Sequence, residues 1–76
     1  MVCPLSEVKP GIKCRIKSIK QNRLYTRLME VGIFNNSEIE VIRTAPLKDP
    51  LECKVGNFYV GLRKSEASLI IVEPLS

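Results

Sequence analysis

The sequence predicts an all-β fold, mainly β with one short helix, in which about five strands close into a small β-barrel. Five short segments alternate apolar and polar residues, as strands with one buried face do. Only one segment has the spacing of an amphipathic helix, and strands and helices do not alternate as a parallel sheet requires. A chain of 76 residues has room for one hydrophobic core, so we expect residues 1–76 to form a single domain.

The first strand is expected to begin after a turn at Pro10-Gly11, which itself follows one helical turn over residues 4–8. From residue 12 onward, apolar and basic side chains alternate and therefore lie on opposite faces. Ile19 breaks this phase, which indicates a bulge or the end of the strand. The apolar positions are Ile12, Cys14 and Ile16, and the basic positions are Lys13, Arg15 and Lys17.

The helix is predicted from about Asn22 to Val31. Asn22 is a favourable N-cap residue, and Gly32 fits the left-handed position that follows a last helical turn. Three apolar residues recur at helical spacing and are expected to pack on the barrel, namely Leu24, Leu28 and Val31.

The later strands follow the same alternation. The second strand is expected over residues 38–44, and a proline-containing loop separates it from a third strand over residues 51–55. Gly56-Asn57 has the form of a two-residue hairpin turn leading into a fourth strand over residues 58–62, where Phe58 is expected in the core. A short helical turn over residues 63–68 then precedes a last strand over residues 69–72.

Charge is unevenly distributed along the chain. Residues 1–27 hold seven basic side chains and one acidic side chain, whereas residues 28–76 hold five basic and seven acidic ones. Such a separation is typical of a surface that meets an acidic partner. The sequence shows neither a secretory leader nor an apolar run long enough to span a bilayer, so we expect a cytoplasmic protein.

Catalytic motifs are missing from the sequence. There is no histidine to shuttle protons near neutral pH and no glycine-rich phosphate-binding loop. Glu38 and Glu40 alternate on an outward strand face, where carboxylates are usually solvated. We therefore predict that the protein is not an enzyme.

The three cysteines are odd in number and widely spaced, which favours reduced thiols over a disulfide framework. Cys14 and Cys53 lie in apolar patterns and are expected in the core. Without a CxxC motif, a histidine or a compact acidic cluster, no stable metal site and no required cofactor are predicted. Weak transition-metal binding, with Cys3 near the start of the chain as a candidate thiol, is the alternative.

Two sets of residues are candidates for binding a partner. Tyr25 and Met29 lie off the core face of the predicted helix, and both residue types are enriched in the centres of protein interfaces. The alternative for this pair is that it covers the rim of the barrel. The basic residues Lys13, Arg15 and Lys17 form the second set, for which an ordinary solvated face is the alternative.

A series of short motifs occurs in a fixed order along the chain. They are Leu5-x-x-Val8-x-x-Gly11, Arg27-Leu28-Met29-Glu30-Val31-Gly32-Ile33, Ile39-Glu40-Val41, Ala45-Pro46 with Asp49-Pro50, Val55-Gly56, Val60-Gly61-Leu62-Arg63, Glu66-Ala67 and Ile70-Ile71-Val72. Through these motifs the chain resembles the FeoA family of small ferrous-iron transport proteins over nearly its whole length. The chain has Asn36 where the family usually has glycine, and Gly61 where the family commonly has alanine. Asparagine is the next-best residue for a left-handed turn.

The resemblance implies an SH3-like barrel that assists FeoB, a membrane ferrous-iron transporter with a cytoplasmic GTPase domain. The chain would then be an accessory or regulatory protein that binds this part of FeoB and reaches the membrane only through it, with no nucleic-acid partner. Its oligomeric state is not predicted. An arginine supplied in trans can accelerate a GTPase, and Arg27 and Arg63 are candidates, although pairing with a carboxylate is the favoured role.

Two other functions are weighed against this one. A nucleic-acid-binding small barrel is suggested by the isoelectric point of 9.2, but the chain has few aromatic residues on which bases could stack. The second is a metal-sensing barrel related to the C-terminal domain of iron-dependent repressors. No DNA-binding pair of helices precedes the barrel in this sequence, which favours the transport accessory.

Overall fold

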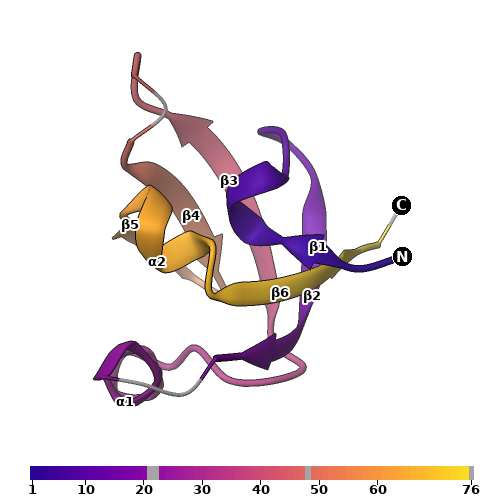
Figure 1. The fold of residues 1–76 in the computed structure, drawn as a ribbon, viewed down its shortest axis with the longest axis vertical. Coiled ribbons are helices and arrows are strands. Elements are labelled where there is room, and N and C mark those ends of the chain that lie inside the picture. The colour runs from indigo at the N-terminus through magenta and orange to yellow at the C-terminus, as the bar shows by residue number, and fades with distance from the viewer. Residues whose placement is uncertain (21–22, 48, 76) are drawn as a thin grey trace.

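The computed structural model describes residues 1–20, 23–47 and 49–75 (Figure 1). The Asn22 cap and the side chain of Leu24, both predicted from the sequence, lie outside what is described. The elements in chain order are β1 (Cys3–Pro4), the short 3-10 helix η1 (Leu5–Glu7), β2 (Lys13–Ile19), α1 (Arg23–Glu30), β3 (Glu38–Thr44), β4 (Leu51–Val55), β5 (Phe58–Leu62), α2 (Lys64–Ala67) and β6 (Ile70–Pro74).

The strands form one antiparallel sheet in the order β1-β6-β2-β3-β4-β5, which coils around the core (Figure 1). The predicted all-β class is therefore confirmed. The expectation of five strands is corrected to six, because Cys3 and Pro4 pair with Val72 and Ile71 of β6. Two residues are too few to show any alternation, so the sequence pattern does not reveal this strand.

The alternating apolar residues fill the barrel as predicted. In β2, Cys14 and Ile16 are fully buried, and a register shift between Ile16 and Ser18 returns Ile19 to the interior. The core residues are Leu5, Val8, Cys14, Ile16, Ile19, Leu28, Ile33, Ile39, Val41, Leu51, Cys53, Val55, Leu62, Ala67, Ile70 and Val72.

The end of α1 departs from the predicted core face. Gly32 has a φ of +92°, and the chain reverses there. The Ile33 N–H donates to the Leu28 carbonyl at 2.9 Å, and the Gly32 N–H donates to the Met29 carbonyl at 3.1 Å. This Schellman arrangement brings Ile33 into the core against Leu28. Val31, predicted to be buried, is instead 45% exposed because the helix ends before it.

Phe58 is a second correction. It was expected in the core but is 39% exposed. It is the first residue of an edge strand, and Val55, which pairs with it across the hairpin, takes the buried position. The left-handed position predicted for Asn36 is confirmed, with a φ of +73°. Within the described ranges, no helix is long and apolar enough to cross a bilayer.

Candidate partner-binding surface

The basic face of β2 lies between two acidic strands. Arg15 Nη2 is 3.3 Å from Glu38 Oε2 on β3, and Lys17 Nζ is 3.3 Å from Glu73 Oε1 on β6. Lys13 stands opposite Glu40 in the β2–β3 register. The basic charge of β2 is therefore offset in space, because the strands that flank β2 carry carboxylates.

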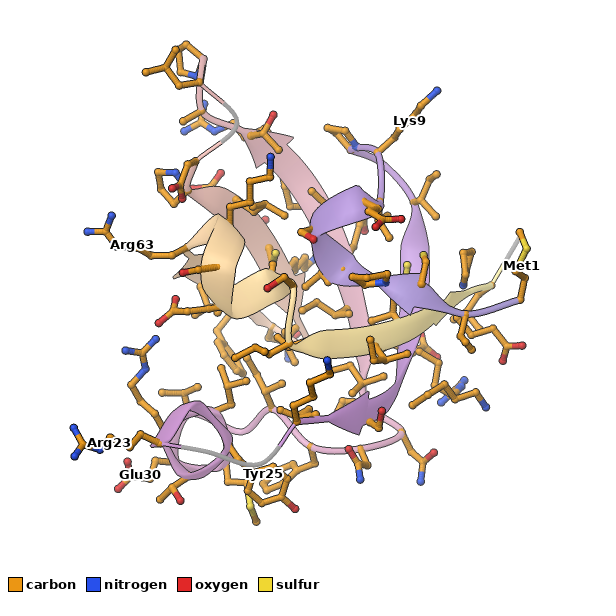
Figure 2. The ribbon with its side chains drawn as sticks, in the orientation of Figure 1. Met1, Lys9, Arg23, Tyr25, Glu30 and Arg63 are labelled. Atoms are coloured by element: carbon orange, nitrogen blue, oxygen red, sulfur yellow. The ribbon has the colours of Figure 1, made fainter. Side chains whose placement is uncertain are left out.

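Arg27 has the carboxylate partner that the sequence analysis favoured. Its guanidinium forms an ion pair with Glu66, which joins α1 to α2. The other carboxylate oxygen of Glu66 accepts the Arg63 N–H at 2.9 Å and so caps the start of α2. The side chain of Arg63 extends away from the molecule (Figure 2).

Exposed apolar side chains surround the end of α1. Met29, Val31 and Phe34 come from the last helical turn and the loop after it, and Phe58 comes from β5. They are exposed by 40%, 45%, 46% and 39% respectively. We call these four residues the helix-end surface, and exposed apolar side chains of this size are candidates for contact with a partner.

At Gly32, the loop that carries part of the helix-end surface packs against β5 of the barrel. A Cβ built on Gly32 would lie 3.6 Å from the tip of the Phe58 ring, so that ring covers the glycine. The positive φ of Gly32 costs an L-residue energy, which explains why glycine occupies this turn. The loop after α1 and the edge strand β5 therefore meet where the Phe58 ring packs on the Gly32 backbone. The sequence of either segment alone does not reveal this contact.

Two surface grooves adjoin the helix-end surface. One, of about 510 Å³, contains Gly32 and Phe58 and is edged by charged residues, among them Lys13 and Lys54. The other, of about 370 Å³, runs between α1 and β5 and is lined by the apolar residues Leu28, Val31 and Val60. Its polar lining residues are Arg27, Arg63 and Glu66.

The predicted binding residues are thus placed differently from one another. Met29 belongs to the helix-end surface, whereas Tyr25 is half-buried and packs against the core. Lys13 lines the same groove as Phe58, while Arg15 and Lys17 are engaged with Glu38 and Glu73. Sequence reasoning missed Val31, Phe34 and Phe58 as surface residues, although the glycine after the helix was a signal that the chain turns outward at Val31.

The thiols do not form a metal centre in the described part of the chain. Cys14 and Cys53 are buried as predicted. Burial, with the Cys3 thiol nearby, raises the pKa of Cys14, and burial raises the pKa of Cys53 to about 11. Metal ligands need a deprotonated sulfur, and among the described residues no three metal-ligating side chains are grouped together.

Comparison of the sequence with known proteins identifies its family. The FeoA domain model matches residues 3–74, which is nearly the whole chain. The chain belongs to the FeoA family. A curated relative, the Fe(2+) transport protein A/Fe(2+) transporter FeoB fusion protein of Porphyromonas gingivalis, is 32% identical over 73 residues. Those residues are 95% of this chain but only 9% of the fusion protein.

Solved FeoA structures have the same fold. Iron(II) transport protein A from Clostridium thermocellum is 42% identical with a TM-score of 0.88, over 95% of this chain and 45% of that one. A zinc complex of FeoA from Stenotrophomonas maltophilia, described as a prokaryotic SH3 domain protein, is 27% identical with a TM-score of 0.80. That match covers 96% of this chain and 89% of the other. The predicted SH3-like barrel is thereby confirmed.

Proposed function

We propose that this FeoA-family chain is a non-catalytic accessory protein of ferrous-iron uptake, which binds the cytoplasmic GTPase-containing part of a FeoB-type transporter. The observation that carries the proposal is the Porphyromonas gingivalis fusion, in which a FeoA-like segment and FeoB are one polypeptide. Fusion holds two modules at high effective concentration. Where a FeoA domain is not fused to FeoB, binding energy must replace that tether, and this requires a docking surface.

The helix-end surface supports the proposal. Met29, Val31 and Phe34 are large enough to bury substantial apolar area against a partner, at roughly 25 cal/mol per Å² removed from water. Their backbone is fixed by the Gly32 turn, so little ordering is needed on binding. Tyr25 and Met29 remain candidate contacts, and the basic strand with Lys13, Arg15 and Lys17 is a second candidate region.

Such a chain would regulate its partner through differential binding to the partner's conformations. A protein without catalytic groups changes a GTPase or a transporter by binding one of its conformations more tightly than another. The same chain would then act in the cytoplasm, where the nucleotide-binding part of the transporter lies.

A binding titration tests the proposal. The purified chain is titrated into the soluble cytoplasmic domain of FeoB from the same organism, with GDP or with a non-hydrolysable GTP analogue bound. We expect saturable binding whose affinity differs between the two nucleotides. Absence of binding in both states would contradict the proposal, and tight, salt-dependent binding to single-stranded or duplex DNA in a parallel titration would favour the nucleic-acid alternative.

A further inference from the structure

The two edges of the sheet are protected to very different degrees. β1 has two residues, one of which is Pro4, and such a short edge offers little to another strand. β5 has five residues, Phe58–Leu62, with neither proline nor a charged side chain. Natural sheets usually blunt an edge of this length with charges, proline or a covering element. The edge of β5 is therefore available for pairing with another strand.

The hairpin geometry shows which β5 groups face outward. Val55 and Phe58 close a two-residue turn in which Gly56 has a φ of +57°, so they form a hydrogen-bonded pair. Because hydrogen-bonded and non-hydrogen-bonded pairs alternate, the N–H and C=O groups of Tyr59 and Gly61 point away from β4. Within the described residues, these groups make no backbone hydrogen bond to a loop or turn.

This outward edge is open to a ligand. Tyr59 is 61% exposed, and a Cβ built on Gly61 would meet no atom within 4 Å. The groove between α1 and β5 runs along the same edge and offers the exposed Val31 and the half-buried Val60 to an apolar side chain, with the buried Leu28 also in its lining.

The charges beside this groove favour an acidic occupant. Arg27 and Arg63 line it. Glu66 of α2 pairs with the Arg27 guanidinium, and among the described residues the Arg63 guanidinium has no ion-pair partner, so Arg63 is the cation left for an acidic occupant. In Figure 2, Arg63 extends away from the molecule on the same side as Arg23, beside which Glu30 lies.

We infer that the free edge of β5 binds an extended segment of the transporter's cytoplasmic region as an added antiparallel or parallel strand. Its backbone pairs with Tyr59 and Gly61, one apolar side chain enters the α1–β5 groove, and a carboxylate lies beside Arg63. Strand addition takes its affinity from main-chain hydrogen bonds and its specificity from alternate side-chain pockets. The inference rests on the proposed function, since it names the way in which the proposed partner docks.

A pair of substitutions at one position tests strand addition. Gly61→Pro removes the outward N–H but no hydrogen bond to β4, and Gly61→Ala keeps the N–H and has room for its Cβ. We expect Gly61→Ala to bind the FeoB cytoplasmic domain within about threefold of the wild type. Gly61→Pro should bind at least about tenfold more weakly, because the pairing hydrogen bonds and the close approach are lost. Circular dichroism and thermal unfolding of the free variants check that both are folded.

Hydrogen exchange of the wild-type protein gives a second readout that needs no variant. The Tyr59 and Gly61 amides should exchange fast in the free protein and become protected in the complex. The Val60 and Leu62 amides, already bonded to β4, should be protected in both. This measurement decides the matter if Gly61→Pro does not fold.

The outcomes separate the inference from the function on which it rests. Equal binding by both Gly61 variants, or no new protection at Tyr59 and Gly61 in a complex that forms, would overturn strand addition and leave the proposed function intact. Failure of the wild type to bind the domain at all would overturn both. Protection that rises with the concentration of the chain alone would assign the edge to a second copy and also overturn the inference.

Discussion

The basic face of β2 and the helix-end surface are the two candidate binding regions, and they are built in opposite ways. The basic face is conspicuous in the sequence, yet in the fold Arg15 and Lys17 meet carboxylates on both neighbouring strands. The helix-end surface is inconspicuous in the sequence, because its members are scattered over residues 29–58. The difference teaches that cross-strand pairing can cancel a run of charge, whereas a turn can expose an apolar side chain that helical spacing would bury.

The largest effect is expected from the core residue beneath the helix-end surface. Leu28 is 1% exposed and anchors α1 through the carbonyl that accepts the Ile33 N–H. Leu28→Ala should lower the free energy of unfolding by about 2 to 5 kcal/mol, because it leaves a cavity and loosens the helix. Urea unfolding measures this. Met29→Ala, one residue away but 40% exposed, is the matched control and should change stability by less than about 1 kcal/mol. Similar losses in both variants would contradict the assignment of α1's buried face.

The next effect concerns binding without loss of fold. Met29→Ser combined with Val31→Ser should weaken binding to the FeoB cytoplasmic domain by at least about tenfold, or about 1.4 kcal/mol, since both side chains are expected to be buried on docking. Thermal unfolding of the double variant should change little, because both residues are exposed. Calorimetric titration measures the affinity. Unchanged affinity would remove the helix-end surface from the interface.

The barrel core, which lies beneath both surfaces, leads to a prediction about how the free energy of unfolding depends on pH. Burial raises the pKa of Cys53 from its ordinary value of 9.0 to about 11. The protonated thiol is therefore favoured by folding, and its contribution is complete below pH 9 and is lost as the pH rises toward 11. Unfolding free energies measured between pH 8 and 11 should fall over this window, and Cys53→Ala should flatten that part of the curve. An equal slope in the variant would show that other groups cause the fall.

The smallest effect is expected on the basic face. Arg15→Gln and Lys17→Gln remove ion pairs between partly exposed side chains, and each should cost about 0 to 1 kcal/mol of stability. Their effect on binding should also be small, and it should shrink as salt is added. Loss of binding in these variants, with the Met29/Val31 variant unaffected, would reverse the comparison between the two surfaces.

Most of the fold could be predicted because alternation and turn chemistry are local. The strand over residues 38–44, the hairpin at Gly56-Asn57 and the bulge before Ile19 all follow from neighbouring residues. β1 could not be found, since two residues show no period and the strand exists only through pairing with β6.

The candidate site was harder to predict because it depends on contacts between distant segments. Val31 has the right helical spacing to be buried, but the turn at Gly32 gives that place to Ile33. Phe58 alternates correctly with Leu62, yet its ring lies over Gly32, some 26 residues earlier in the chain. The carboxylates that neutralise β2 likewise come from β3 and β6, which a reading of charge along the chain does not bring together.

The most direct test of docking through the helix-end surface is a two-dimensional ¹⁵N–¹H correlation titration of the labelled chain with the unlabelled FeoB cytoplasmic domain. We predict that the largest shift changes or line broadening fall on residues 29–34 and on β5, while residues 13–17 of β2 change little. Perturbations confined to residues 13–17, or a spectrum that does not change at a saturating concentration of the domain, would contradict docking through the helix-end surface.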